Sequence, residues 1–258
     1  MNDELLRAVA ERQWRDYCAR TPGTLFAGAE EPPFDVADAY AVQRAVADIR
    51  LAGGDTIAGF KVGCTGPGTT TQFGMAGPIR GFLFGSEIRS SGTTLAPDGF
   101  ASLAIEGEMA VSIGESGAIV SAFPVIELHN FVFRCRRKTL AELIANNGFN
   151  AGIIMARGRS ALLETMIPAW NTLGVRINGS LVAEAGLWPL PGGPAASLDW
   201  LRGDLAREGL SISPGQIVIV GTPLGLYPVH PGDRIETCLD GVSVVACSVE
   251  QPALRPSE

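Results

Sequence analysis

The sequence predicts an α+β protein, in which helices precede a body made mostly of strands. Amphipathic helical patterns lie near the N-terminus, and short apolar runs broken by Gly and Pro follow Gly54. Strands and helices do not alternate regularly, which disfavours a doubly wound parallel sheet. With 258 residues, 46% of them hydrophobic, the chain can bury a sizeable core. We expect a helical N-terminal portion over 1–56 and a β-rich domain over 57–258.

Helices are predicted where apolar residues recur at helical spacing. The first such pattern lies within 5–14, and the second covers 36–49. A Pro pair at 32–33 separates the two, and a Gly pair at 53–54 ends the second. The same spacing predicts two further helices, over 139–145 and 198–205.

Strands are predicted by short apolar runs bounded by turn residues. The clearest hairpin places Asn178-Gly179 at the turn between two such runs. Further strands are expected over 57–63, 81–85, 105–113, 217–220, 234–239 and 242–249.

The charge balance argues against a nucleic-acid partner. The net charge is -7 at pH 7 and the isoelectric point is about 5.0, whereas phosphate binding needs clustered Lys and Arg. The dense basic run at 134–138 is interpreted as a strand end or helix start that faces solvent.

Cysteine usage and the apolar runs favour a cytoplasmic protein. The five cysteines are scattered without a C-x-x-C pair, which fits reduced thiols. The N-terminal stretch has no apolar signal core, and no later stretch approaches the length of a membrane span. We therefore expect no membrane partner.

The glutamates at 106, 108 and 127 form the pattern with the clearest chemical meaning. Glu106 and Glu108 are two residues apart in an apolar strand, so both side chains project from one face. Glu127 lies in a second strand-like run, where an unpaired carboxylate would be costly to bury. Such a trio suits Mg²⁺ or Mn²⁺, which take oxygen ligands and leave room for a chelating 2-oxo acid. A solvated strand edge with Glu paired to Arg or Lys is the alternative, and the pattern alone leaves both open.

Several short segments occur in an order and spacing that are specific as a set. They are A-Y-A-V-Q at 39–43, G-F-K-V-G at 59–63, G-F-L-F at 81–84, I-E-G-E at 105–108, V-I-E at 125–127, L-G-V at 173–175, N-G at 178–179, G-T-P at 221–223 and V-H-P-G-D at 229–233. In these segments the chain resembles the 2-keto-4-pentenoate hydratase and 4-oxalocrotonate decarboxylase branch of the fumarylacetoacetate hydrolase superfamily. The resemblance spans nearly the whole chain.

The resemblance implies a β-roll or flattened β-barrel catalytic body with a smaller helical N-terminal portion. It implies that residues 57–258 bind Mg²⁺ or Mn²⁺ through Glu106, Glu108 and Glu127. Relatives of this kind commonly form homo-oligomers, and we expect the same here.

Further site residues are expected on the matched segments. Lys61 is the family's K-V-G lysine, and its cation would neutralise a substrate carboxylate or developing enolate; a snorkelling surface lysine is the alternative. The turn at Gly221 and Thr222 would hold a substrate carboxylate through backbone N–H groups and the Thr222 hydroxyl, unless it is an ordinary hairpin connection. Asn147 and Phe84 are additional candidates for substrate binding.

The chain departs from the family pattern at two places. The hydratases have an acidic residue shortly after G-x-L-F, where this chain has Ser86 and then Glu87, so Glu87 is the candidate catalytic substitute. An Asp-Asn-Ala-Ser-like stretch of relatives corresponds to 146–150, where Asn146 and Phe149 replace the Asp and a Ser.

The interval between Glu108 and Glu127 is shorter than in the hydratases, as though the turn at 115–117 had replaced a helix. Two residues beyond Glu127, His129 would share its strand face and serve as a neighbour of the metal ligands or a proton shuttle. A structural histidine is the alternative.

The expected function is that of a metal-dependent lyase acting on a small 2-oxo or 2-hydroxydienoic acid. The acid would chelate the ion, an enolate would be stabilised, and Lys61 would support the negative charge. Hydration is the leading candidate reaction. Decarboxylation is the second candidate, because it passes through the same stabilised enolate. The alternatives are an acylpyruvate C–C hydrolase, whose lid histidine has no counterpart here, and a binding protein that kept the fold without catalysis.

Overall fold

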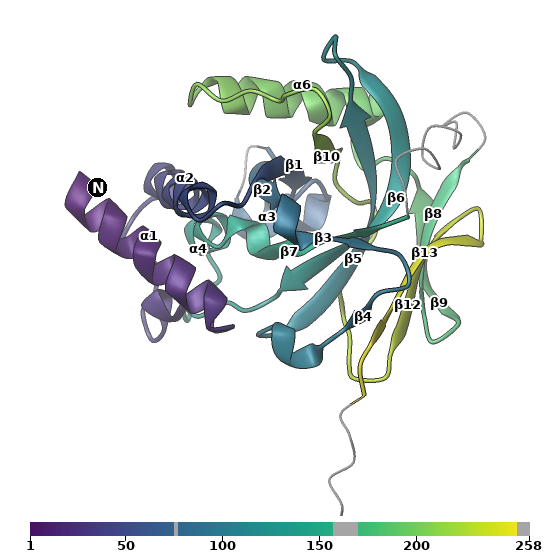
Figure 1. Ribbon diagram of the computed structural model, residues 1–258, viewed down its shortest axis with the longest axis horizontal. Coiled ribbons are helices and arrows are strands. Elements are labelled where there is room, and N and C mark those ends of the chain that lie inside the picture. The colour runs from purple at the N-terminus through teal and green to yellow at the C-terminus, as the bar shows by residue number, and fades with distance from the viewer. Residues whose placement is uncertain (75–76, 157–169, 252–258) are drawn as a thin grey trace, which may run out of the picture.

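The computed structural model describes residues 1–74, 77–156 and 170–251. It has two β-sheets, and Figure 1 shows α1, α2 and α4 on the left, α6 along the top, and the strands from the centre to the right. The α+β prediction is confirmed, and residues 3–52 are mainly helical, before the first strand begins at Ile57.

Two long helices open the chain, and both are capped by the residue that precedes them. In α1 (Asp3–Cys18) the side chain of Asn2 accepts a hydrogen bond from the Leu5 N–H at 2.9 Å. In α2 (Val36–Ala52) Asp35 accepts from the Asp38 N–H at 2.9 Å. Such caps satisfy backbone donors that the helix itself leaves unpaired. The short helix η1 (Thr24–Phe26) lies between them.

The first sheet has eight strands and carries the predicted glutamates. Its order is β2-β1-β10-β5-β6-β7-β3, with β11 paired to β5. The strands are β1 (Ile57–Gly63), β2 (Ile79–Phe84), β3 (Ile88–Ser90), β5 (Leu103–Ile113), β6 (Ile119–Asn130), β7 (Asn150–Met155), β10 (Ile217–Ile219) and β11 (Tyr227–Pro228). At Gly59 a Cβ atom would lie 1.7 Å from the Ile217 carbonyl oxygen, so the contact of β1 with β10 requires glycine there.

The second sheet has five strands in the order β4-β13-β12-β8-β9. Their bounds are β4 (Thr94–Leu95), β8 (Thr172–Ile177), β9 (Ser180–Gly186), β12 (Arg234–Leu239) and β13 (Val242–Val249). The predicted hairpin at Asn178-Gly179 joins β8 to β9, and both turn residues have positive φ, as this kind of turn requires.

The two sheets pack through an apolar layer. Ile105 and Ile126 of the first sheet meet Val175 and Ile235 of the second. Because strand side chains alternate, the glutamates one residue away from Ile105 and Ile126 face the opposite side, toward the helices. The remaining helices are α3 (Pro67–Phe73), α4 (Leu140–Ala145) and α6 (Gly193–Ala206), with the short turns η2 (Gly85–Glu87), η3 (Pro97–Gly99) and η4 (Asn147–Phe149).

No helix within the described residues is both long and apolar enough to cross a membrane. The five cysteines are all free thiols.

Candidate metal centre and substrate pocket

The antiparallel pair β5 and β6 brings the glutamates together. In the strand register Glu106 is directly opposite Glu127, and Glu108 is opposite Val125. Glu127 is 0% exposed and Glu108 is 2% exposed, while Glu106 retains partial access to solvent. The connection between the strands is a short turn over 114–118, as the sequence predicts.

Two side chains from other strands hold the Glu127 carboxylate. The Lys61 ammonium of β1 donates to Glu127 Oε1 at 2.5 Å, and the Asn150 side-chain amide of β7 donates to the same oxygen at 2.6 Å. Lys61 is 3% exposed, so the alternative of a snorkelling surface lysine does not hold. A buried cation and a buried anion therefore lie in direct contact at the base of the site.

His129 continues along β6 on the same face as Glu127. Its Nε2 atom lies 3.1 Å from Glu106 Oε2 and 3.5 Å from Glu127 Oε2. Neither approach has the alignment of a hydrogen bond. The imidazole therefore lies against both carboxylates.

The mutual burial of these groups shifts their pKa values in opposite directions. Burial raises the pKa of Glu108 well above its ordinary value, and the charges of Glu127 and Glu106 raise it further. Burial would also raise the pKa of Glu127, but the nearby cations Lys61 and His129 lower it instead. For Lys61 burial favours the neutral amine, yet Glu127 and the other two carboxylates outweigh it and raise the pKa. The raised pKa of Glu108 favours its protonated form, which indicates that the cluster holds more negative than positive charge.

The donor set fits a divalent cation. Three buried atoms of the cluster lack a hydrogen-bond partner among the described residues: Glu108 Oε2, Glu127 Oε2 and His129 Nε2. Glu106, Glu127 and His129 each offer a ligand atom, and these atoms lie within 4.8 Å of one another. Leaving buried acceptors unpaired is costly, and a metal ion would satisfy them. Mg²⁺ and Mn²⁺ take carboxylate oxygens, which Glu106 and Glu127 offer in this set, whereas the predicted ligand Glu108 lies outside it.

A pocket of about 260 Å³ opens beside this cluster. Lys61, Glu106 and His129 line its charged end. Apolar side chains form much of the remaining wall, including Ile79, Phe131, Phe133, Phe149, Leu224 and Leu226. Phe133 and Phe149 pack edge to face, with ring centroids 4.8 Å apart. A small molecule with one polar end and an apolar chain matches this lining.

The turn that follows α4 closes one side of the pocket, and Asn147 fastens it to the sheet. The Asn147 Oδ1 atom accepts from the Phe82 N–H at 2.7 Å, and its Nδ2 donates to the Phe82 carbonyl at 2.8 Å. The side chain thus pairs with β2 as a neighbouring strand would. Asn147 has a positive φ of 57°, a conformation that Asn tolerates better than most residues. The predicted substrate-binding residue therefore positions the turn.

We expect Asn147→Ala to lower the free energy of unfolding by about 2–4 kcal/mol, because it leaves a buried donor and acceptor of Phe82 unpaired. Urea unfolding followed by circular dichroism measures the change. Asn171→Ala, at an exposed site, is the control and should change stability by less than about 0.5 kcal/mol. Equal effects of the two substitutions would contradict this role of Asn147.

Thr222 and Gly221 lie on the loop that follows β10, and Thr222 fastens this loop to the sheet. The Thr222 hydroxyl donates to the Gly107 carbonyl at 2.6 Å and accepts from the Leu224 N–H at 3.0 Å. Its hydrogen bonds therefore tie the loop to β5 between the two glutamates of the E-x-E pair. Within the described residues the pocket is lined by the next part of this loop, 224–226, and by neither of the two predicted residues.

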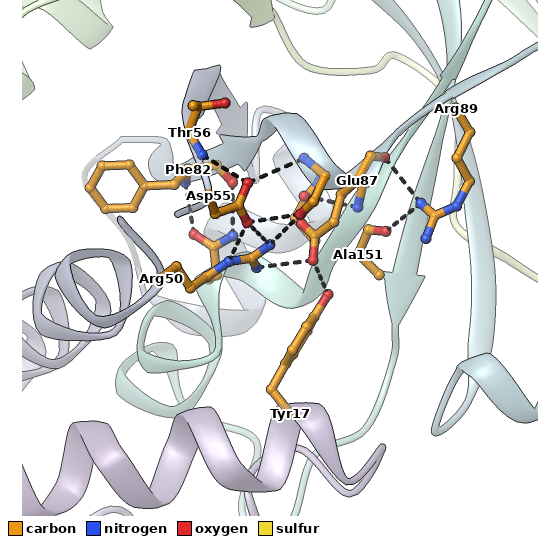
Figure 2. Close-up of polar contacts among 12 residues, drawn as sticks. Tyr17, Arg50, Asp55, Thr56, Phe82, Glu87, Arg89 and Ala151 are labelled. Carbon is orange, nitrogen blue, oxygen red and sulfur yellow. Dashed lines mark hydrogen bonds and ion pairs between the residues drawn. The ribbon is translucent and has the colours of Figure 1, made fainter. Parts of the chain in front are cut away.

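Glu87 and Phe84 belong to a different network, on the side of α1 and α2. Figure 2 shows the Glu87 carboxylate between Tyr17 and Arg50, and the Arg50 Nη1 atom donates to it at 2.9 Å. Arg50 also binds Asp55 at 2.7 Å, and its guanidinium lies 3.5 Å from the centre of the Phe84 ring. The turn η2 directs Glu87 toward these helices. Neither Glu87 nor Phe84 lines the pocket beside Glu106 in the described part of the chain.

Asn150 and the aromatic wall are the site residues that sequence reasoning missed. Asn150 was visible only as part of a stretch that departs from the family pattern. Its contact with Glu127 joins β7 to β6 and depends on strand pairing that local sequence does not reveal. Phe131 and Phe133 follow the end of β6, the strand that carries Glu127. This nearness in sequence to Glu127 is the one signal that could have identified them as pocket residues.

Over most of its length the chain is similar to several enzymes of known activity. No family model matches the chain. The chain is 25% identical over 235 residues to 2-oxo-hept-4-ene-1,7-dioate hydratase of Escherichia coli, covering 84% of this chain and 87% of that protein. It is 28% identical over 229 residues to 4-oxalocrotonate decarboxylase of Pseudomonas putida, covering 83% and 86%.

A solved structure is similar to the chain in fold. The 4-oxalocrotonate decarboxylase of Pseudomonas putida G7, complexed with magnesium and adipate, superimposes with a TM-score of 0.83 at 24% identity, over 96% of this chain and 98% of that chain. The predicted fold of the fumarylacetoacetate hydrolase superfamily is confirmed. Over most of its length the chain is therefore similar, at 22–28% identity, to proteins named 2-keto-4-pentenoate hydratase and 4-oxalocrotonate decarboxylase.

Proposed function

We propose that this chain is a divalent-metal-dependent lyase that acts on a small 2-oxo or 2-hydroxydienoic acid, with hydration as the leading reaction. The observation that carries the proposal is the set of unpaired buried atoms on Glu108, Glu127 and His129, beside the cation of Lys61. Homologues named as hydratases and decarboxylases of such acids support it.

The carboxylates of Glu106, Glu108 and Glu127 are the proposed ligands of Mg²⁺ or Mn²⁺. Hard cations prefer oxygen over imidazole nitrogen, so His129 is assigned as a neighbour that orients two of the carboxylates. A bound ion of this kind supplies Lewis acidity, which polarises a 2-oxo group and stabilises negative charge. Relatives of this fold have been solved with magnesium and with calcium.

The chain's own residues would bind and orient the acid. The Lys61 ammonium lies at the charged end of the pocket and supports negative charge that develops on the substrate. Asn150 holds the Glu127 carboxylate in place through its hydrogen bond of 2.6 Å. The Phe133 and Phe149 rings exclude water from one wall, which strengthens the electrostatic interactions inside.

Decarboxylation is the second candidate reaction, and the similarity to 4-oxalocrotonate decarboxylase favours it. Both reactions use the same carboxylate cluster and the same charged end of the pocket. Two alternative functions remain, an acylpyruvate C–C hydrolase and a non-catalytic binding protein on the same fold. The experiment below would reveal either of them.

The test is a proton NMR screen of 2-oxo acids with Mg²⁺. We expect the wild type to convert at least one acid, and Glu106→Gln and Glu108→Gln to lower kcat/KM by about 100-fold or more, since each removes a proposed ligand charge. Calorimetry with Mg²⁺ alone should show weaker binding in both variants. His129→Gln should retain metal binding within about tenfold, as for a residue that orients a ligand.

Glu115→Gln, in the turn between β5 and β6, is the matched control because Glu115 is an exposed glutamate of the same hairpin. Unchanged Mg²⁺ affinity in both Glu106→Gln and Glu108→Gln would reject the metal centre. Metal binding by a wild type that converts no 2-oxo acid would identify a binding protein.

We also propose that the enzyme forms homo-oligomers and that 1–56 is an N-terminal portion distinct from the catalytic domain at 57–258. The helical content of 1–56 supports the division. Light scattering after size-exclusion chromatography measures the oligomeric state, and limited proteolysis tests the boundary.

A further inference from the structure

The pocket beside the carboxylate cluster contains both lysines of the sequence. Among its 20 basic residues, Lys61 and Lys138 are the only lysines, and both line this pocket. Lys61 is buried and bound to Glu127, whereas Lys138 is exposed. The two cations therefore mark the inner end and the outer rim of one cavity.

Lys138 differs from its neighbours in the basic run. Arg137 forms an ion pair with Glu31 at 2.6 Å, and Arg136 approaches Glu30 at 4.0 Å. Lys138 makes no hydrogen bond or ion pair with any described residue. Its Nζ atom instead lies 5.4 Å from the centre of the Phe133 ring and 5.8 Å from that of Phe131, two rings of the pocket wall. The charge is directed to the pocket and has no anionic partner there.

The order of chemical groups along the pocket defines the ligand that it fits. Glu106 and the buried Lys61 line it beside the carboxylate cluster, aromatic and aliphatic side chains form much of the wall, and the exposed Lys138 ammonium lies near the Phe131 and Phe133 rings. In a protein of net charge -7, a dianionic ligand needs local cations to offset the overall repulsion.

We propose that Lys138 binds the far carboxylate of a 2-oxo dicarboxylic acid, and so selects dicarboxylic over monocarboxylic substrates. The inference rests on the proposed function, which places the 2-oxo acid end of the substrate at the carboxylate cluster. The apolar wall contacts the chain between the two ends. Lys138 acts on specificity, and the reacting atoms lie at the other end of the pocket.

The first test compares two 2-oxo acids of equal chain length, 2-oxoadipate and 2-oxohexanoate, which differ in the far carboxylate. Calorimetry with Mg²⁺ present should show that Lys138→Met weakens 2-oxoadipate binding about fivefold to tenfold, as expected for a partly exposed ion pair. Binding of 2-oxohexanoate should change less than about twofold. Lys138→Arg, which keeps the charge, should restore most of the difference.

Arg137→Met is the control, since it removes the adjacent charge of the same run, which is already paired with Glu31. It should leave the affinities for both acids unchanged.

The second test follows Lys138 without relying on variants. An amine-acylating reagent should modify exposed Lys138 and spare buried Lys61, and peptide mass spectrometry would quantify both. We expect 2-oxoadipate to protect Lys138 and 2-oxohexanoate to leave it reactive. The amino group of Met1, which does not line the pocket, is the internal reference.

The outcomes separate this inference from the proposed function. If the wild type binds both acids with equal affinity, or if Lys138→Met weakens both equally, the role of Lys138 is wrong while the metal-dependent site stands. If the wild type neither binds nor converts any 2-oxo acid, the proposed function and this inference both fail.

Discussion

Lys61→Met is expected to lower the free energy of unfolding of the metal-free protein by about 3–5 kcal/mol, because it leaves a buried carboxylate without its cation. Glu127 is 0% exposed and receives the Lys61 ammonium at 2.5 Å. Turnover of the substrate found by NMR should fall by about 100-fold or more, since the same ammonium is proposed to support charge on the substrate. Urea unfolding and steady-state kinetics measure the two effects.

A double variant separates stability from chemistry. Lys61→Met combined with Glu127→Leu removes both charges, and replacing a buried pair by apolar groups is often neutral for stability. We expect the double variant to regain most of the lost stability and to remain inactive. A stability loss below about 1 kcal/mol in Lys61→Met alone would show that the pair is not the buried contact described here.

Arg80→Met is expected to cost about 3–5 kcal/mol of stability, for the same physical reason at a site away from the chemistry. Arg80 is 1% exposed and joins β2 to α6 and the residues that follow it, through Asp204 at 2.5 Å and Glu208 at 2.6 Å. Its guanidinium also lies 4.2 Å from the centre of the Tyr40 ring. Thermal and urea unfolding measure the loss.

Arg207→Met is the matched control for Arg80, because Arg207 pairs with the same Asp204 carboxylate at 3.2 Å from an exposed position. It should change the free energy of unfolding by less than about 1 kcal/mol. Similar losses in both variants would mean that the burial of Arg80 does not decide the effect.

Local pattern was sufficient to predict most of the elements. The strands at 57–63, 234–239 and 242–249 have the predicted bounds, because glycine and turn residues delimit each apolar run. The strand β7 was missed, since it follows the turn at Asn147–Phe149 without a separating signal of its own.

The glutamates could be identified because carboxylates inside apolar strands are conspicuous in a sequence. Their assembly with Lys61 and Asn150 depends on which strands pair, and that order is a property of the whole sheet. A hydroxyl such as that of Thr222 can serve a ligand or a backbone carbonyl, and only the folded chain shows that it donates to Gly107. The direction of Glu87 is likewise set by a single turn at the end of β2.

The direct pairing of Glu106 with Glu127 across the hairpin means that the spacing of these two acids is fixed by strand register and is independent of loop length. The connecting peptide can therefore be lengthened, shortened or exchanged without moving either oxygen pair. A slip of one residue, by contrast, would carry one acid to the apolar interior and separate the two proposed ligands. The tip of this hairpin is therefore the place where new sequence can be grafted while Glu106 and Glu127 stay opposite each other.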